Sequence, residues 1–255
     1  MALNLTPLAA LRDNYIWVVD DGRCALVIDP GEARPVTRML SSQRLHLAGL
    51  LLTHHHADHI GGVAPLKAMS PDCRVIGSAA DLGPLLTHPC SDGERLTIER
   101  MELTIDVMAV PGHTLHHLAY RINNWLFCGD TLFGAGCGRL FEGSPQQLYE
   151  SLQRLAALPD QTLICCAHEY TLGNLAFAAE LEPDNPHIQA RLTRDRDARQ
   201  RGLPTLPSTL GEEKLTNPFL RCHLPQLQQA VGAAAGDNVT AFTLMRQRKD
   251  IFRTA

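Results

Sequence analysis

The sequence predicts an α/β fold, in which a layered body of strands and helices precedes a helical C-terminal region. Short apolar runs rich in β-branched residues fill the first two thirds of the 255 residues, with helical stretches between them. After about Thr171 helical patterns continue, and no strand run of comparable strength occurs. Alternating strands and helices build layered domains. We therefore expect a domain boundary near residue 170, with a layered α/β domain over residues 1–170 and a helical domain over residues 171–255.

Each expected strand is an apolar run bounded by turn signals. The runs are Tyr15–Asp20, Cys24–Asp29, Leu47–Thr53, Leu103–Val110, Leu118–Ile122, Trp125–Cys128 and Thr162–Ala167. Expected helices are Ala33–Leu40, His59–Ala68, Pro145–Ala157, Thr171–Leu181, Pro186–Gln200, Leu224–Val231 and Asn238–Arg248. Ser144 before Pro145 is a typical N-cap followed by a first helical residue.

Composition excludes several classes of protein. With 45% hydrophobic and 20% charged residues, the chain is too apolar to be disordered. No run approaches the roughly 18 apolar residues of a membrane span, and the start has no signal-peptide pattern, so we expect a cytoplasmic protein. The net charge of −4 disfavours a nucleic-acid partner. Residues 1–170 carry a net charge of −6 and residues 171–255 a net charge of +2. The positive charge of the second part would favour binding of an anionic substrate there.

Cysteine and histidine are used differently. The eight cysteines form no Cys-x-x-Cys pair, and a chain of this length buries a core without disulfides, so we expect reduced, mostly buried thiols. The 12 histidines are clustered, with four in residues 54–59 and three in residues 113–117. Such clusters indicate metal binding.

The segment Thr53–His59 reads His-x-His-x-Asp-His from residue 54. Imidazole and carboxylate are donors that Zn, Fe and Mn accept. On an extended segment, His54 and His56 project to the same side and can hold one ion, which leaves Asp58 and His59 for a second.

Three more ligand-type residues follow apolar strands: His113, Asp130 and His168. Strand ends are where α/β proteins build their sites. Seven donors are too many for one tetrahedral ion but suit two ions that share a carboxylate. The alternative for the cluster is an adventitious surface patch. For His55, His116 and His117 we favour supporting roles over metal ligation.

In this order, these residues resemble the metallo-β-lactamase superfamily, and further motifs narrow the resemblance to glyoxalase II, the hydroxyacylglutathione hydrolases. The motifs are Asp13-Asn-Tyr15, Pro111-Gly-His-Thr114, Gly129-Asp-Thr-Leu-Phe133, Gly136-Cys-Gly-Arg139, Ala167-His-Glu-Tyr170, Asn217-Pro-Phe-Leu-Arg221 and Arg246-x-x-Lys249-Asp250. The resemblance implies a four-layer αββα sandwich with a C-terminal helical domain. It also implies that residues 1–170 form the metallo-β-lactamase-like catalytic domain and residues 171–255 the substrate-binding domain.

The resemblance also implies roles for single residues. His54, His56 and His113 would hold one divalent ion, Asp58, His59 and His168 the other, and Asp130 would bridge them. Zn²⁺ is expected, with Fe or Mn as alternatives. Glutathione contacts would come from Arg139, Phe141, Tyr170, Arg246 and Lys249. Arg139 and Phe141 stand where the eukaryotic pattern has Lys and Tyr, and bacterial members are similar to this chain at both positions.

The implied reaction is hydrolysis of S-D-lactoylglutathione to D-lactate and glutathione by a metal-bridged hydroxide, which Asp58 would orient. The thiol leaving group, with a pKa of about 8.5, departs as thiolate without a general acid. Alternatives are a glutathione persulfide dioxygenase or another hydrolase of this fold, such as a β-lactamase, a lactonase or a nuclease. A non-catalytic binding module is disfavoured. We expect a monomer without a membrane partner.

Overall fold

The computed structural model describes residues 3–253, which form two compact units. Unit 1 comprises Met1–Ala109 and His116–Gly129, and unit 2 comprises Val110–Leu115 and Asp130–Ala255. The predicted domain division at residue 170 stays a prediction. Within the described residues, no helix has the length and apolar character that crossing a membrane requires.

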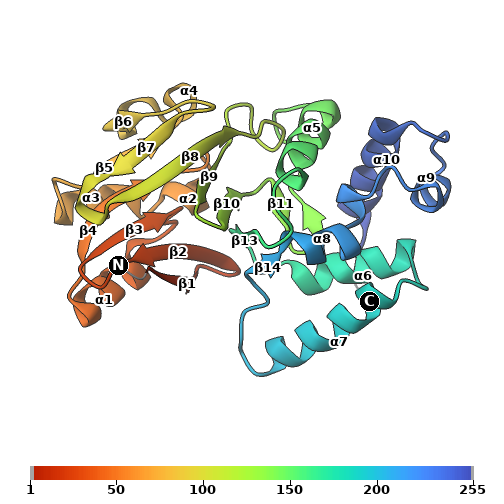
Figure 1. Cartoon of the computed structure of the whole chain (residues 1–255), viewed down its shortest axis with the longest axis horizontal. Helices are drawn as coiled ribbons and strands as arrows, with labels where there is room; N and C mark the ends of the chain where they lie inside the picture. The colour runs from red at the N-terminus through yellow and green to blue at the C-terminus, as the bar shows by residue number, and fades with distance from the viewer. Residues whose placement is uncertain (1–2, 254–255) are drawn as a thin grey trace. The chain divides into compact units, whose positions relative to one another are not determined.

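Unit 1 contains two sheets (Figure 1). The first has the order β1-β2-β3-β4-β5-β6, in which β1, β2 and β3 are antiparallel neighbours and β3 to β6 run parallel. Its strands are β1 Asn4–Ala10, β2 Asn14–Asp20, β3 Cys24–Ile28, β4 His46–Leu51, β5 Arg74–Gly77 and β6 His88–Pro89. The second sheet contributes the antiparallel strands β7 Arg95–Ile98, β8 Leu103–Ala109, β9 Leu118–Ile122 and β10 Trp125–Gly129.

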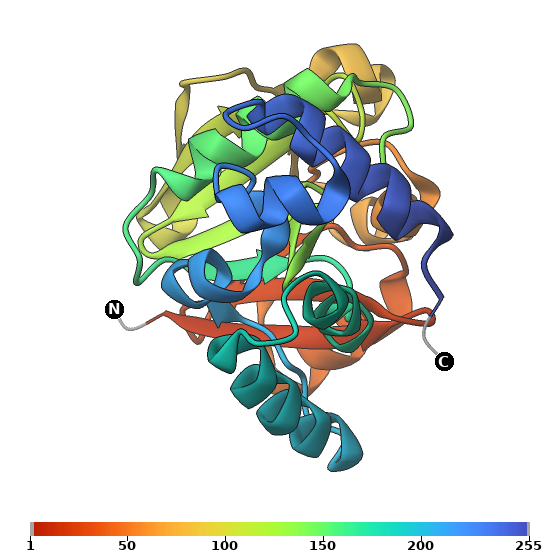
Figure 2. The same ribbon diagram turned by 90° about the vertical axis from the view of Figure 1, so that its right-hand side faces the viewer.

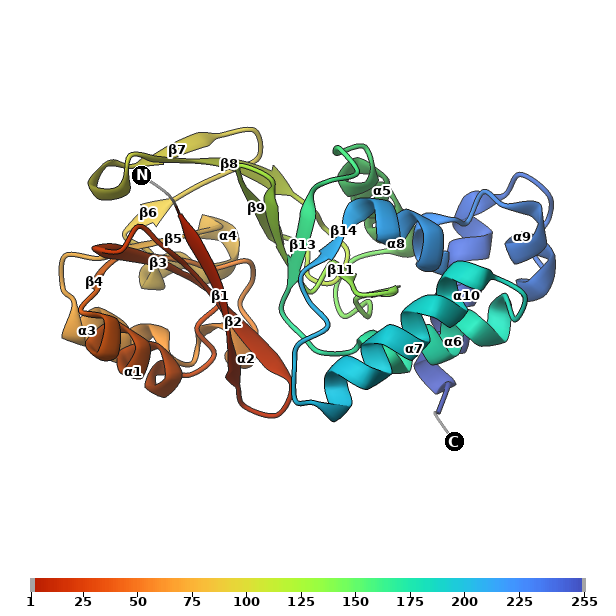
Figure 3. The same ribbon diagram turned by 60° about the horizontal axis from the view of Figure 1, so that its bottom comes forward.

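The two sheets pack face to face inside unit 1. The hydroxyl of Tyr120 on β9 donates to the carbonyl oxygen of Leu52 at 2.7 Å, and the Trp17 and Phe127 rings meet edge to face. On its other face the first sheet is covered by helices α1 and α3, whose buried Val36 and Leu66 belong to the same core cluster (Figure 3). A helix layer and two sheet layers therefore share one unit.

The helices of unit 1 are short. They are α1 Ala33–Gln43, α2 Ala57–Ile60, α3 Val63–Met69, α4 Ala79–Leu82 and the 3₁₀ turns η1 Gly83–Leu85 and η2 Glu99–Met101. The prediction of one helix over His59–Ala68 is wrong, because the chain breaks at Gly61 and Gly62 into α2 and α3. A Cβ on Gly62 would lie 2.6 Å from the Pro30 carbonyl oxygen, so only glycine allows this close approach.

Unit 2 is mainly helical. Its strands form two antiparallel pairs, the hairpin β11 Leu132–Phe133 with β12 Gly136–Cys137, and β13 Leu163–Cys166 with β14 Ser208–Thr209. Its α-helices are α5 Pro145–Ala156, α6 Thr171–Leu181, α7 Pro186–Gln200, α8 Leu210–Thr216, α9 Pro225–Val231 and α10 Asn238–Ile251. The 3₁₀ turn η3 spans Pro218–Leu220. Helix α5 begins with the predicted Ser144 cap, which forms a capping box with Gln147. Helices α5 and α10 lie side by side (Figure 2), with the Tyr149 and Phe242 rings 6.0 Å apart.

The eight cysteines are all free thiols, and seven of them are buried. Burial raises the pKa of Cys137 to about 11 and that of Cys90 to about 11, so both stay protonated near neutral pH. The expectation of mostly buried cysteines is confirmed, and their reduced state stays a prediction.

Candidate functional site

Asp29, His54 and His59 meet at the C-terminal ends of two parallel strands of unit 1. Strands β3 and β4 are neighbours in register, so Asp29 after β3 lies beside Thr53 after β4. The Asp29 carboxylate accepts the backbone N–H of Thr53 at 2.8 Å, the Thr53 hydroxyl at 2.7 Å and the Nδ1 of His59 at 3.1 Å. One buried carboxylate therefore organises both ends of the His-x-His-x-Asp-His segment.

These bonds determine which nitrogen of each imidazole faces outward. The Thr53 hydroxyl uses its proton on Asp29, so it accepts from the Nδ1–H of His54, 3.0 Å away. His59 likewise donates its Nδ1–H to Asp29. Both rings then present the Nε2 lone pair, which is the form that binds a metal ion.

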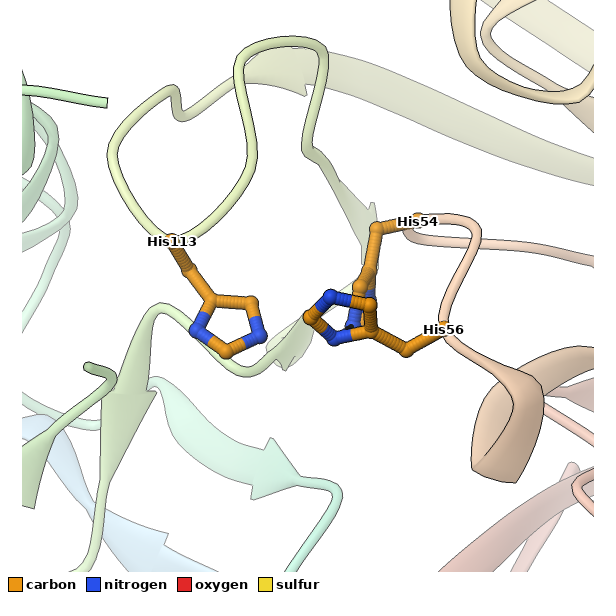
Figure 4. Close-up of side chains that lie close together, drawn as sticks. All are labelled: His54, His56 and His113. Carbon is orange, nitrogen blue, oxygen red and sulfur yellow. Dashed lines mark hydrogen bonds between the residues drawn. The ribbon is translucent and has the colours of Figure 1, made fainter. Parts of the chain in front are cut away.

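The predicted pairing of His54 with His56 is present. The two side chains lie side by side on the segment that joins β4 to α2 (Figure 4, which also labels His113), with His54 Nε2 and His56 Nδ1 3.0 Å apart. Asp58 follows, with an oxygen 3.6 Å from His59 Nε2, and Asn14 on β2 donates to its carboxylate at 3.0 Å. Ligand-type atoms of these residues thus converge within unit 1.

The other predicted ligands lie in unit 2. His113 Nε2 is 3.4 Å from one oxygen of Asp130, and His168 Nε2 is 3.4 Å from the other. His113 donates its Nδ1–H to the Arg139 carbonyl at 2.8 Å, which again leaves Nε2 as the outward atom. A carboxylate between two imidazoles has the arrangement expected of a bridging ligand.

All seven predicted ligands thus occur in two convergent sets, four in unit 1 and three in unit 2. Five of them, His54, His59, His113, Asp130 and His168, are buried. Buried imidazoles and carboxylates with outward lone pairs are the chemistry of a divalent-metal site. The donor set therefore fits the metal ions that the sequence predicts.

The three remaining histidines of the two clusters differ from the ligands, and His116 is exposed. His117 is fully buried in unit 1, and its ring stacks on that of His54 at a centroid distance of 4.7 Å. His55 lies 2.9 Å from Asp81. Their supporting roles stay a prediction, and the ring stack of His117 and the Asp81 contact of His55 are the contacts through which they would act.

A cavity of about 640 Å³ opens beside Asp130 in unit 2. The predicted glutathione contacts Arg139, Phe141, Tyr170, Arg246 and Lys249 all line it. Three of these side chains are cationic, which suits an anionic ligand. The aromatic residues face the ligands in the same unit: the Tyr170 ring stacks on His168 at 4.7 Å, and the Phe141 ring meets His113 edge to face at 5.2 Å.

The three cations are held differently. Arg139 is largely exposed, whereas Arg246 is buried and donates to the Cys137 carbonyl at 2.8 Å and to Asp250 at 3.0 Å. Lys249 donates to the Gly173 carbonyl at 2.9 Å. Burial, with help from the nearby charges of Arg246 and Arg139, lowers the pKa of Lys249 to about 8.

The sequence did not predict that Asp29 and Thr53 orient the histidines of the site. A signal was present, because Asp29 follows an apolar strand and precedes Pro-Gly, the same position that identified the ligands. Asp29 binds Thr53 and His59, which lie 24 and 30 residues away in the sequence, so local spacing could not predict these hydrogen bonds.

Comparisons with known proteins agree with this geometry. Residues 10–168 match the family model described as metallo-beta-lactamase superfamily, and residues 169–252 match the model described as hydroxyacylglutathione hydrolase C-terminus. A relative from Nitrosomonas europaea, named hydroxyacylglutathione hydrolase, is 46% identical over 98% of this chain and 97% of its own length.

Two solved structures extend the comparison. ETHE1 from Myxococcus xanthus is 25% identical, with a TM-score of 0.70 over 99% of this chain and 93% of its own. TTHA1623, solved in a di-iron-bound form, is 30% identical, with a TM-score of 0.57 over 67% of this chain and 96% of its own. The predicted metallo-β-lactamase-like α/β fold with a helical C-terminal region is confirmed. The chain belongs to the hydroxyacylglutathione hydrolase family of the metallo-β-lactamase superfamily.

Proposed function

We propose that this protein is a binuclear metal-dependent thioesterase that hydrolyses S-D-lactoylglutathione to D-lactate and glutathione. The observation that carries the proposal is that this chain has all seven ligand residues together with a cation-lined cavity beside Asp130. The relatives named hydroxyacylglutathione hydrolase support the substrate class, at 46% identity over nearly full length.

The ligands are proposed to act as two groups joined by a bridge. His54, His56 and His113 would hold one ion, Asp58, His59 and His168 the other, and Asp130 both. The di-iron form of TTHA1623 supports a two-ion centre, and the donor set accepts Zn²⁺, Fe or Mn. We propose Zn²⁺ as the resident metal. When bound, such ions lower the pKa of water to near 7 and polarise a carbonyl oxygen.

The protein's own residues would supply position and charge. Asp58 is proposed to accept a hydrogen bond from the attacking nucleophile, and the Asn14 amide, which donates to its carboxylate at 3.0 Å, would fix its orientation. The departing sulfur needs no proton donor, because a glutathione thiol leaves as thiolate.

Glutathione recognition would rest on the cavity. A glutathione thioester carries two carboxylates, and Arg139 and Lys249 are the cationic lining residues proposed to receive them. Arginine binds a carboxylate through two parallel hydrogen bonds. Tyr170 and Phe141 would supply apolar contact along the peptide. The free thiols support a reducing compartment such as the cytoplasm.

The test compares three reactions of the metal-loaded protein. Release of thiol and D-lactate from S-D-lactoylglutathione is expected, whereas oxygen uptake with glutathione persulfide and cleavage of a chromogenic β-lactam are not. A lactoyl thioester of N-acetylcysteamine, which carries no carboxylate, should show a much higher KM. Turnover of the persulfide or the β-lactam with the lactoyl thioester left intact would contradict the proposal.

A further inference from the structure

The hairpin β11–β12 connects two functional positions of unit 2. Asp130 lies just before it and Arg139 just after it, and Phe133 within it packs edge to face against His168 and Tyr170. The conformation of this short segment therefore controls where a proposed metal ligand and a proposed substrate contact lie.

Side chains from the helices hold the hairpin by its backbone. Asn174 on α6 donates to the Gly134 carbonyl at 3.0 Å, and Glu213 on α8 accepts the Ala135 N–H at 2.7 Å. Asn217, which follows α8, donates to the Gly136 carbonyl at 2.9 Å. Consecutive backbone groups are thus bound by residues that lie 40 to 81 positions away in the sequence.

The hairpin has a strained backbone that these contacts must maintain. Ala135 has a φ of +53°, a conformation that residues with a Cβ rarely adopt. Such strain persists only when the surroundings over-determine it, and it occurs mainly at functional sites. The backbone segments on either side of the hairpin approach each other closely, because a Cβ on Gly138 would lie 1.9 Å from the Asp130 carbonyl oxygen.

Glu213 is itself fixed. It is fully buried, and its second oxygen accepts from the Arg191 guanidinium at 2.7 Å and from the Ser208 hydroxyl at 2.6 Å. Arg191 is also buried and binds Thr216 at 2.7 Å. Both oxygens of the Glu213 carboxylate are thus occupied by hydrogen bonds, which restricts the position of this side chain.

We propose that Glu213 and Asn217 are positioning residues of the active site, which fix the hairpin between Asp130 and Arg139 in its working conformation. The inference rests on the proposed function, since it deepens the role of the helical region. That region would shape the catalytic site in addition to lining the substrate cavity.

Asn217 and Asn185 offer a matched pair of variants. The Oδ1 of each caps a following helix, and the Nδ2 of each donates to a backbone carbonyl, that of Gly136 for Asn217 and that of Leu215 for Asn185. The Nδ2 of Asn217 also lies 3.3 Å from the Phe133 carbonyl oxygen and 3.3 Å from Oε2 of Glu213. Serine keeps the cap but cannot reach the carbonyl. Asn217→Ser therefore removes the hydrogen bonds that hold the hairpin, whereas Asn185→Ser removes a single bond of the same type at a less buried site of the same unit.

The experiment measures kcat, KM and backbone amide exchange on full-length, metal-loaded protein, well below the melting temperature of each variant. Asn217→Ser should lower kcat/KM for S-D-lactoylglutathione about tenfold or more, and should speed exchange of the Ala135 amide about tenfold. Asn185→Ser should change neither by more than about twofold. Asn174→Ser, which frees the Gly134 carbonyl, serves as a second variant if Asn217→Ser does not fold.

Three outcomes would overturn the inference. They are unchanged exchange in folded Asn217→Ser, unchanged kcat/KM despite faster exchange, or equal losses in both serine variants. If the wild-type protein does not hydrolyse the thioester, the proposed function fails. The exchange measurement, together with the metal content of the variants, then still decides whether the hairpin is held as proposed.

Discussion

Replacing Asp29 by Asn should weaken metal binding without touching a ligand. Asn has the shape of Asp and tolerates the positive φ of this position, +51°, so the backbone need not move. The carboxylate accepts three hydrogen bonds, whereas the amide offers one acceptor oxygen and one donor group. The backbone N–H of Thr53 cannot reverse, so the amide oxygen should face it.

The amide nitrogen then faces the Thr53 hydroxyl and His59 Nδ1. Thr53 would accept from it and donate to His54 Nδ1, which moves the proton of His54 onto Nε2. His59 would change tautomer in the same way. Both imidazoles would present an N–H where the metal needs a lone pair. Loss of such an orienting partner lowers metal affinity about 10- to 100-fold, which corresponds to about 1.4–2.7 kcal/mol.

The assay is a titration of apo protein with Zn²⁺ against a competing chelator. Asp20→Asn is the matched control. Asp20 is equally buried, and a single one of its oxygens accepts from Asn4 and Gly22, so an amide keeps both bonds. Asp29 has no orienting role if folded Asp29→Asn binds Zn²⁺ as tightly as the wild type, or if Asp20→Asn loses affinity equally.

Three further predictions concern unit 2. Asp130→Ala should lose both ions, as measured by elemental analysis, and two retained ions per chain would contradict a bridge. The Lys249 ammonium has a pKa lowered to about 8 and loses its charge as pH rises through that value, so the KM of the wild type should increase above about pH 8. In Lys249→Arg, which keeps its charge, this increase should be absent. A wild-type KM that does not change with pH would count against the contact. Tyr170→Phe should keep metal content because the stack on His168 remains, whereas Tyr170→Ala should lower it; equal metal content in both would show that the stack has no such role.

The strands that bear the ligands could be predicted because each is a continuous apolar run. Strand β9 has the predicted bounds Leu118–Ile122, and the strands before His54, Asp130 and His168 are displaced by at most two residues at either end. Strand β1 was not predicted, since Pro7 and polar residues interrupt its pattern, and proline is tolerated there because β1 lies at the sheet edge.

The orienting residues could not be predicted, because their function depends on distant partners. Glu213 looks like an ordinary helix-surface glutamate in the sequence, yet it binds Ala135, 78 residues away. Asn217 belonged to a family-like motif without an assigned role. Ligand types can be identified from local spacing, whereas the bonds that set their tautomers and positions form only when remote segments fold together.

If two ions held by the seven ligands make this protein a glutathione thioesterase, its activity must follow metal occupancy. The most direct measurement adds Zn²⁺ stepwise to the apo protein and follows thiol release from S-D-lactoylglutathione. Activity should rise to a plateau at two ions per chain and should be abolished by a chelator. A plateau at one ion, or no thiol release by protein that holds two, would contradict this prediction.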